Sequence, residues 1–370
     1  EGYSVYAAVE IYNTPLNSKV PNYMNLDLRV TPYKSEQGQF NEQKISSITQ
    51  NGKRGLTFTS FGEGSVWSEN GRRGAAVSFS QNTAARLTLR VPPTVTGWLG
   101  GRLSKAEIKV TKVNDTTNQL IIGGYPVTVG IASVVIDREQ APEYFKQHLA
   151  TNPQSSGIGY KGSNGVYEVL NSIRPFLKDK SIREETRWSL ESYPNSTNRC
   201  LNDKSKLVGI VTTNATVFNA VPPTFSDGVL SYKVSGLHYR PSGDLTIGQY
   251  DLVMRSEVAR CLYSFTSAPV QGTVSITYEN GQAQTATTLI NEKDGWLYLG
   301  AYNFSYSNPT IKIKLTQAGG SGAVGAKPLP SQTPVASNKP IKTIMCIKKS
   351  VVKKVVGLTP KCPSGYKLVK

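Results

Sequence analysis

Hydrophobic and polar residues alternate over short stretches through most of the first 137 residues. In Ala85–Val91, apolar side chains alternate with Arg and Thr, which is the pattern of a strand with one buried and one solvated face. The pairs Asn51-Gly52 and Asn70-Gly71 separate such stretches, and both residue types tolerate the positive φ of tight turns. The pattern predicts an antiparallel β-sandwich over residues 1–137. Its expected strands are Ser4–Tyr12, Leu26–Val30, Leu56–Thr59, Ala75–Phe79, Ala85–Val91, Glu107–Thr111, Gln119–Ile122 and Val127–Ile136.

The periodicity becomes helical after Pro142. Residues Pro142–Leu149 are expected to form a short helix, and apolar residues recur at helical spacing between Val166 and Leu177. Pro175 should kink or end the second helix, because proline lacks the backbone N–H that a helix needs. We therefore predict a helical connector over residues 138–184.

Strand patterns return over residues 185–317 and predict a second antiparallel sandwich. The clearest hairpin joins Val274–Tyr278 to the next strand through Glu279–Gln282. A chain of 370 residues is also long enough for two domains. The expected fold class is thus mainly β, with two sandwiches of the immunoglobulin-like or jelly-roll-like kind.

The C-terminal end has a different composition. Residues 318–342 are rich in Gly, Ser, Pro and Ala without an apolar period, which is typical of a linker. Beyond it, Ile344–Val356 alternates Lys with Val and Ile. Residues 343–370 should therefore form a small basic module, a hairpin held by a disulfide between Cys346 and Cys362.

The four cysteines form two groups along the chain, Cys200 with Cys261 and Cys346 with Cys362. They permit three connectivities, and the two local pairings are favoured because each lies within one predicted module. Cys200 would then tie a loop to a strand that carries Cys261. Free buried thiols are the alternative for the first pair. Since there is no C-x-x-C spacing and the chain has only two His, we predict no metal site and no cofactor.

The formal charge of +17 is concentrated at the C-terminal end. Residues 295–370 contain 12 Lys and no acidic residue, so the remaining residues carry 17 − 12 = +5. Lysine without arginine suits a diffuse polyanion, such as an anionic envelope polymer or polysaccharide, better than a specific nucleic-acid site. A purely solubilising surface is the alternative. The candidate polyanion-binding residues are Lys348, Lys349, Lys353, Lys354, Lys361 and Lys367.

Several short motifs suggest chemistry but lack the required context. Residues Gly157–Gly162 match G-x-G-x-x-G, yet no β-α-β unit surrounds them. His238 lies near Ser242 and Asp251 in the sequence, without a nucleophile elbow. The acidic pairs Glu184 with Glu185 and Glu139 with Glu143 have no evident cleft. We therefore predict no catalytic residues and no enzyme activity.

The aromatic residues suggest a second kind of binding surface. The chain has 19 Tyr together with Trp67, Trp98, Trp188 and Trp296, and aromatic rings can stack on sugars. Aromatic residues in strands are more often core residues or cross-strand pairs. A carbohydrate-binding module, or an accessory to a polysaccharide hydrolase, therefore stays an alternative.

Several segments resemble parts of uncharacterised secreted proteins of actinobacteria. They are Thr96–Leu103 (TGWLGGRL), Glu257–Tyr263 (EVARCLY) and Asn291–Leu297 (NEKDGWL). The ending, Thr343–Lys349 (TIMCIKK) with Pro360–Lys367 (PKCPSGYK), is similar to a C-terminal tail shared by many such surface proteins. The resemblance implies an exported protein and supplies no catalytic residues.

The sequence begins at Glu1 rather than Met and contains no run of about 18 apolar residues, so we predict a removed leader and no membrane span. An expressed fragment with an arbitrary start is the alternative. Our leading hypothesis is a non-catalytic, secreted cell-surface protein with an adhesive or envelope-associated role. A second hypothesis is homo-oligomeric assembly into a filament, sheath or surface layer through strand edges or Tyr3–Tyr12.

Overall fold

A computed structural model describes most of the chain. The described residues are 2–12, 23–35, 49–50, 53–59, 65–67, 73–151, 166–193, 196–203, 205–219, 221–267, 269–278, 283–284, 286–306, 308–317, 342–348, 351–357, 362 and 365–368. The chain divides into two units, Glu1–Gly320 and Ser321–Lys370. Strands account for 60% and helices for 11% of the described structure, so the predicted mainly β class is confirmed.

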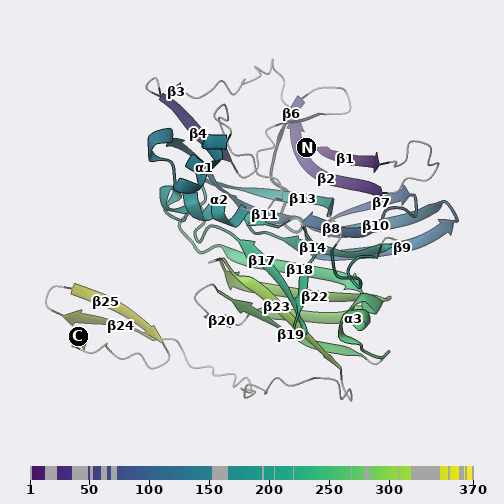
Figure 1. The fold of residues 1–370 in the computed structure, drawn as a ribbon. Helices are drawn as coiled ribbons and strands as arrows, with labels where there is room; N and C mark the ends of the chain where they lie inside the picture. Colours follow the sequence, from purple (N-terminus) through teal and green to yellow (C-terminus); the bar gives the residue numbers. More distant parts are fainter. Residues whose placement is uncertain are drawn as a thin grey trace. The chain divides into compact units, whose positions relative to one another are not determined.

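An eleven-stranded sheet runs through the first unit (Figure 1). Its strands are β1 (Gly2–Tyr12), β2 (Tyr23–Ser35), β5 (Ser65–Trp67), β6 (Arg73–Ala76), β8 (Gly97–Arg102), β11 (Val127–Ile131), β13 (Arg183–Tyr193), β14 (Leu207–Thr213), β18 (Ile247–Arg255), β21 (Thr287–Lys293) and β22 (Trp296–Ser305). The order is β21-β22-β18-β14-β8-β13-β2-β6-β5, with β1 paired to β2 and β11 paired to β13. The pairing of β8 with β14 is parallel, and the other pairings in this sheet are antiparallel.

Two smaller sheets pack against this large sheet. One has the order β7-β10-β9, and the other has the order β15-β17-β23-β19-β20 with β16 paired to β17. The first comprises β7 (Ala85–Val91), β9 (Ser104–Asn114) and β10 (Thr117–Tyr125). The second comprises β15 (Val217–Phe218), β16 (Thr224–Ser226), β17 (Val229–Ser235), β19 (Val270–Thr277), β20 (Ala283–Gln284) and β23 (Thr310–Gln317).

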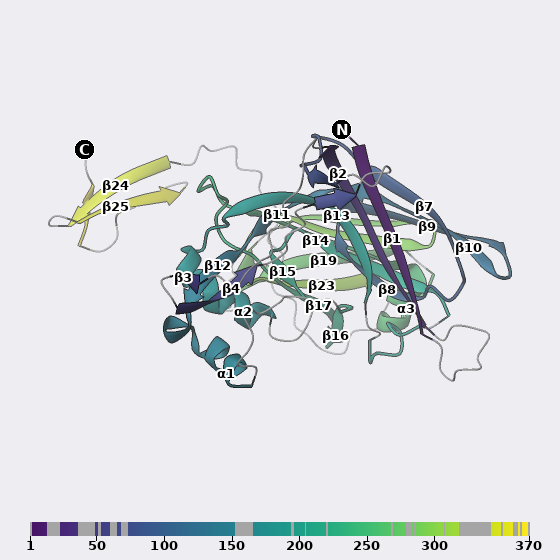
Figure 2. The same cartoon turned by 90° about the horizontal axis from the view of Figure 1, so that it is seen from above.

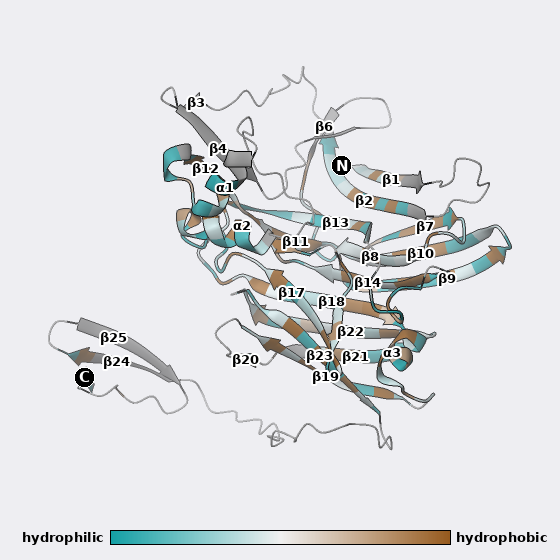
Figure 3. Cartoon of the chain, viewed as in Figure 1, coloured by the Kyte–Doolittle hydropathy of each residue, from teal (hydrophilic) through white to brown (hydrophobic). Residues whose placement is uncertain are grey.

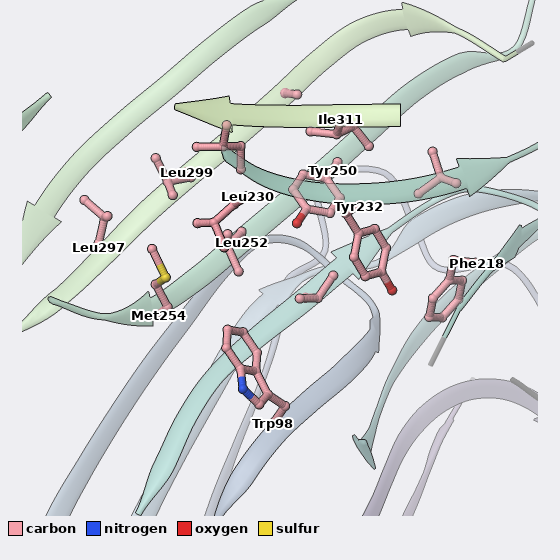
Figure 4. Close-up of a cluster of buried hydrophobic side chains, with 14 of the residues drawn as sticks. Trp98, Phe218, Leu230, Tyr232, Tyr250, Leu252, Met254, Leu297, Leu299 and Ile311 are labelled. Atoms are coloured by element: carbon pink, nitrogen blue, oxygen red, sulfur yellow. The ribbon is translucent and has the colours of Figure 1, made fainter. Parts of the chain in front are cut away.

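Strand β18 shows how the large sheet contributes to two cores. Tyr250, Leu252 and Met254 pack with side chains of the β17, β19 and β23 sheet (Figure 4). Val253, which points to the opposite face because strand side chains alternate, packs with Ile108 and other side chains of the β7-β10-β9 sheet. Figure 3 colours the residues of β18 by their hydropathy and shows its apolar run. Burial on both faces of the strand explains this run.

The helices of residues 138–177 gather at one end of the large sheet, away from β7, β9 and β10 (Figures 1 and 2). They are η1 (Arg138–Gln140), α1 (Glu143–Thr151), α2 (Val166–Ile173) and the 3₁₀ turn η2 (Arg174–Leu177), and they lie near the sheet of β3 (Thr49–Gln50), β4 (Lys53–Thr59) and β12 (Ser133–Asp137). Phe145, Leu170 and Ile173 pack with Ile136 and Leu237 in a separate core. Pro175 lies in η2, directly after the end of α2.

The two predicted sandwich ranges are joined by one sheet. Strands β8, β13 and β14 are neighbours in it, although they come from both sides of the expected boundary at residues 137 and 138. Sheet pairing therefore crosses the range that we expected to separate two sandwiches. At the predicted hairpin, β19 pairs with the two-residue strand β20 in antiparallel register, and the expected turn Glu279–Gln282 lies outside the described residues.

Our expectation that Cys261 lies in a strand was wrong. Residues Ser256–Tyr263 form the helix α3, which begins directly after β18. Val258 and Ala259 are buried, and Leu262 packs against the same core. This spacing of apolar residues fits one helical face, but it also resembled a continuation of the preceding strand.

The second unit contains a small antiparallel sheet in the order β25-β24-β26. Its strands are β24 (Lys342–Lys348), β25 (Val351–Gly357) and β26 (Lys367–Leu368). Cys346 lies opposite Lys353 on β25 and opposite Leu368 on β26. A hairpin in this region therefore agrees with the alternation of Lys with Val and Ile.

Candidate functional site

The candidate lysines of the C-terminal unit fall into three groups. Lys348 and Lys367 are exposed, and neither forms an ion pair with a described residue. The ammonium group of Lys348 lies 5.9 Å from the centre of the Tyr366 ring. In β25, Lys353 and Lys354 lie opposite Cys346 and Met345 of β24. The remaining two candidates, Lys349 and Lys361, lie outside the described residues.

The disulfide between Cys200 and Cys261 is confirmed, with a sequence separation of 61 residues. It ties the loop after β13 to the helix α3 rather than to a strand. Cys362 is also disulfide-bonded. The side chain of Cys346, its expected partner, lies outside the described ones.

A cleft of about 570 Å³ lies in the first unit, between the β7-β10-β9 sheet and strands β18, β21 and β22. Its walls combine apolar side chains with charged ones. The apolar part includes Ala106, Ile108, Ile121, Val253, Leu289 and Leu299. The polar part includes Arg86, Lys105, Glu107, Lys109, Asp251, Asn291, Lys293, Asp294 and Tyr298.

Asp251 is the buried acidic residue of this cleft, with 5% of its surface exposed. The backbone N–H of Lys105 donates to Oδ2 at 3.2 Å, and the hydroxyl of Tyr302 donates to Oδ1. Burial raises the pKa of Asp251 to about 6, against the opposing effect of these two donors and of the Lys105 charge. The carboxyl group is therefore held in place by both walls of the cleft.

The backbone around the cleft is shaped to bring these donors to Asp251. Lys105 has a φ of 52° and lies at a register irregularity between β9 and β10, which directs its N–H toward β18. On the opposite wall, a Cβ on Gly300 would lie 2.6 Å from the hydroxyl oxygen of Tyr302. Glycine at this position leaves the space through which Tyr302 reaches Asp251.

A second cleft, of about 370 Å³, is lined by β2, β6 and β13. Its charges are largely neutralised within the protein. The carboxylate of Glu185 pairs with both Arg183 and Arg187, at 2.7 Å for Arg183, and Arg29 pairs with Asp27 at 2.9 Å. This cleft therefore offers less unpaired charge to a ligand than the first one does.

His238, Ser242 and Asp251, which lie near one another in the sequence, have separate partners in the structure. His238 Nδ1 lies 3.8 Å from Asp179, Ser242 donates to Asp244 at 2.8 Å, and Asp251 belongs to the cleft. No hydrogen bond joins the three residues within the described structure. The motif Gly157–Gly162 lies outside the described residues.

Of the two acidic pairs considered from the sequence, Glu184 and Glu185 form ion pairs with arginines. Glu184 forms an ion pair with Arg240 at 2.7 Å, and Glu185 lies between two arginines as described above. The backbone N–H of Glu139 donates to Asp137 at 3.1 Å. Glu184 and Glu185 both line the second cleft, where each is paired with an arginine.

Three of the four tryptophans are core residues. Trp98, Trp188 and Trp296 are 0%, 1% and 4% exposed. The indole N–H of Trp98 donates to the carbonyl of Leu201 at 2.8 Å. These rings cannot form an exposed sugar-stacking surface, and the side chain of Trp67 lies outside the described ones.

Among the described residues, no helix has the length and apolar character needed to cross a membrane. Within the same part of the chain, no group of three or more His, Cys, Asp or Glu side chains is arranged to hold a metal ion. No family model, curated protein or solved structure matches the chain.

Sequence reasoning missed the cleft and treated Asp251 only as a possible partner of His238. One local signal was available. Asp251 interrupts the otherwise apolar run Tyr250–Met254, and an acidic residue within a buried strand needs hydrogen-bond donors nearby. The identity of those donors depends on the pairing of distant strands.

Proposed function

We propose that this protein is a non-catalytic, secreted component of a cell surface, and that its C-terminal unit binds an anionic envelope polymer. The observation that carries this proposal is the separation of charge between the two units. Residues 321–370 contain 10 Lys, no Arg and no acidic residue. They hold +10 of the formal +17, which leaves 17 − 10 = +7 for residues 1–320.

A set of lysines that follow one another closely along the chain suits a flexible polyanion. Lysine acts as a mobile point charge and does not need the fixed geometry of a bidentate arginine contact. The exposure of Lys348 and Lys367 leaves their charges accessible to a polymer. The resemblance of the tail to those of secreted actinobacterial proteins supports the same role.

We also propose that the second disulfide joins Cys346 and Cys362. This bond would close the small sheet of the C-terminal unit, and domains as small as Ser321–Lys370 commonly need such a link to stay folded. Mass mapping of proteolytic fragments under non-reducing conditions tests the pairing. A fragment that links Cys362 to Cys200 or Cys261 would contradict it.

The binding role can be tested on the full chain with two charge-matched variants. In the first, Lys348, Lys349, Lys353, Lys354, Lys361 and Lys367 are replaced by Gln. In the control, the exposed residues Lys112, Lys146, Lys178, Lys180, Lys312 and Lys314 of the first unit are replaced by Gln, so that both variants lose the same formal charge.

The measurement is co-sedimentation with envelope material rich in anionic polymer. We expect the tail variant to lose most of its retention and the control variant to keep it. Equal retention of both variants would refute the role of the tail. Equal loss would show that only the total charge matters.

A second candidate function is self-assembly through the edge strand β1. Among the described strands, only β2 pairs with β1, over the register from Gly2–Tyr33 to Tyr12–Tyr23. Tyr3, Val5 and Tyr6 of this strand are 50%, 57% and 50% exposed. A long edge with exposed apolar side chains can pair with another chain.

The substitution Val5→Lys tests this candidate, because a charge on an edge strand opposes edge-to-edge pairing. Light scattering coupled to size-exclusion chromatography should show assemblies of the unmodified chain that the variant does not form. A monomer at every concentration of the unmodified chain would exclude assembly through β1.

A further inference from the structure

We propose that the cleft between the β7-β10-β9 sheet and strands β18, β21 and β22 binds an acidic sugar, a ring that carries hydroxyl groups beside a carboxylate. This inference concerns the first unit and does not rest on the role of the C-terminal unit. Its basis is the combination of a fixed buried carboxyl group, three ammonium groups without an ion pair among the described residues, and an apolar wall.

The size of the cleft suits a small saccharide. Its volume of about 570 Å³ lies within the range of ligand sites in proteins, roughly 300 to 1,000 Å³. The walls come from two different sheets, so a ligand would contact strands on both sides. Leu289 is 45% exposed although it lines the cleft, so the cleft is reachable from solvent there.

The carboxyl group of Asp251 is positioned before any ligand arrives. Lys105 donates to it from β9, and Tyr302 donates to it from β22. A carboxylate has about four lone-pair sites, and these two donors leave acceptor capacity for further donors. Sugar hydroxyl groups are such donors, and a fixed acceptor can orient a ring at little entropic cost.

The cleft is lined by four positive side chains, Arg86, Lys105, Lys109 and Lys293, and by three carboxyl groups, Glu107, Asp251 and Asp294, so its formal charge is +1. Arg86 is paired with Glu107 at 3.1 Å. In contrast, Lys105, Lys109 and Lys293 line the cleft without an ion pair to any described residue. Their ammonium groups can contact an anionic group on the ligand. A neutral sugar would leave this charge unused.

The apolar wall supplies the remaining part of a sugar site. Ile108, Ile121 and Val253 face the cleft together with the ring of Tyr298. Sugar rings have an apolar C–H face beside their hydroxyl groups, and aromatic and aliphatic side chains can cover it. The cleft thus offers separate contacts for the hydroxyl groups, the carboxylate and the C–H face of one ring.

Isothermal titration calorimetry of the full chain with trigalacturonate tests the proposal, with maltotriose as the neutral probe. The variants are Asp251→Asn, which keeps the size of the side chain, and Leu289→Trp, which fills the cleft mouth from an exposed position. A double variant, Lys348→Ala with Lys367→Ala, reports on the C-terminal unit. Thermal unfolding of each variant shows whether it is folded.

We expect saturable binding of trigalacturonate and at least about tenfold weaker binding of maltotriose, a difference of about 1.4 kcal/mol. Leu289→Trp and Asp251→Asn should each weaken trigalacturonate binding by at least about tenfold. The double lysine variant should bind as the unmodified chain does.

Three results would overturn the proposal. They are the absence of saturable binding up to about 10 mM, equal binding of both sugars, and loss of binding in the double lysine variant with retention in Leu289→Trp. The last result would place the site in the C-terminal unit, and it would support the proposed function while it refutes this inference. If Asp251→Asn does not fold, Leu289→Trp still tests whether the sugar binds in the cleft.

Discussion

Replacing Asp251 with Asn should change how the stability of this protein depends on pH. Asp251 is 5% exposed, and burial raises its pKa from the usual 3.8 to about 6. Between these two values the folded protein holds the proton of Asp251 more tightly than the unfolded chain does. The stability contributed by this proton is therefore complete below about pH 4 and is lost as the pH rises through about 6.

The size of the effect follows from the two pKa values. The difference between 3.8 and about 6 corresponds to about 3 kcal/mol, at 1.36 kcal/mol for each pKa unit. Asn cannot ionise, so the variant lacks this pH dependence. Other groups titrate alike in both proteins and cancel when their unfolding free energies are subtracted. The loss of the carboxylate's hydrogen bonds adds a constant to the difference between the two unfolding free energies.

The assay is urea unfolding of both proteins at a series of pH values between about 3.5 and 8. The unfolding free energy of the unmodified protein minus that of Asp251→Asn should fall by about 2 to 3 kcal/mol from pH 4 to pH 7. A difference that stays constant would show that Asp251 is not buried as the structure has it. A difference that rises with pH would show that its pKa is lowered by its donors.

Two further substitutions test the packing of the first unit. Replacing Cys200 and Cys261 with Ser opens a loop with a sequence separation of 61 residues. Chain entropy predicts that the free energy of unfolding falls by about 4 kcal/mol. A loss below about 1 kcal/mol in urea unfolding would contradict this role of the disulfide. In Gly100→Ala, the new Cβ would lie 1.7 Å from Cζ of the buried Tyr193. We therefore expect the free energy of unfolding to fall by about 3 kcal/mol or more. A melting temperature equal to that of the unmodified protein would refute this contact.

Local patterns were enough to predict the class of this fold, but they missed one of the central strands of its large sheet. Strand β8 was missed because its sequence, GWLGGR, is rich in glycine, which is depleted in strands. The structure explains the glycines by close approach. A Cβ on Gly101 would lie 2.1 Å from the backbone oxygen of Ser189 on β13. The need for glycine at this position arises from the pairing of strands that are distant in the sequence.

The helix α3 was missed for a different reason, because its sequence is compatible with two local structures. Its sequence, SEVARCLY, has apolar residues that fit either a strand or one face of a helix, and a short apolar run does not distinguish them. The structure places Val258 and Ala259 in the core beside β18 and β22. Tertiary packing thus decided between two local structures that the sequence allowed.

The candidate sites differ in how far the sequence predicts them. The basic C-terminal end is visible directly in the composition, because its lysines are adjacent along the chain. The cleft is not, since Lys105, Asp251 and Lys293 belong to three strands that are far apart in the sequence. Only the three-dimensional pairing of β9, β18 and β21 with their neighbours brings these residues to one cleft.

The proposed role of the C-terminal unit is tested most directly by the salt concentration at which the full chain elutes from an immobilised anionic polysaccharide. Salt screens exposed charges, with a Debye length of about 8 Å at physiological ionic strength. We predict that the six Lys→Gln replacements in residues 348–367 lower the elution salt concentration far more than the six matched replacements in the first unit do. Equal elution of the two variants would contradict the proposal that the C-terminal unit binds the polymer.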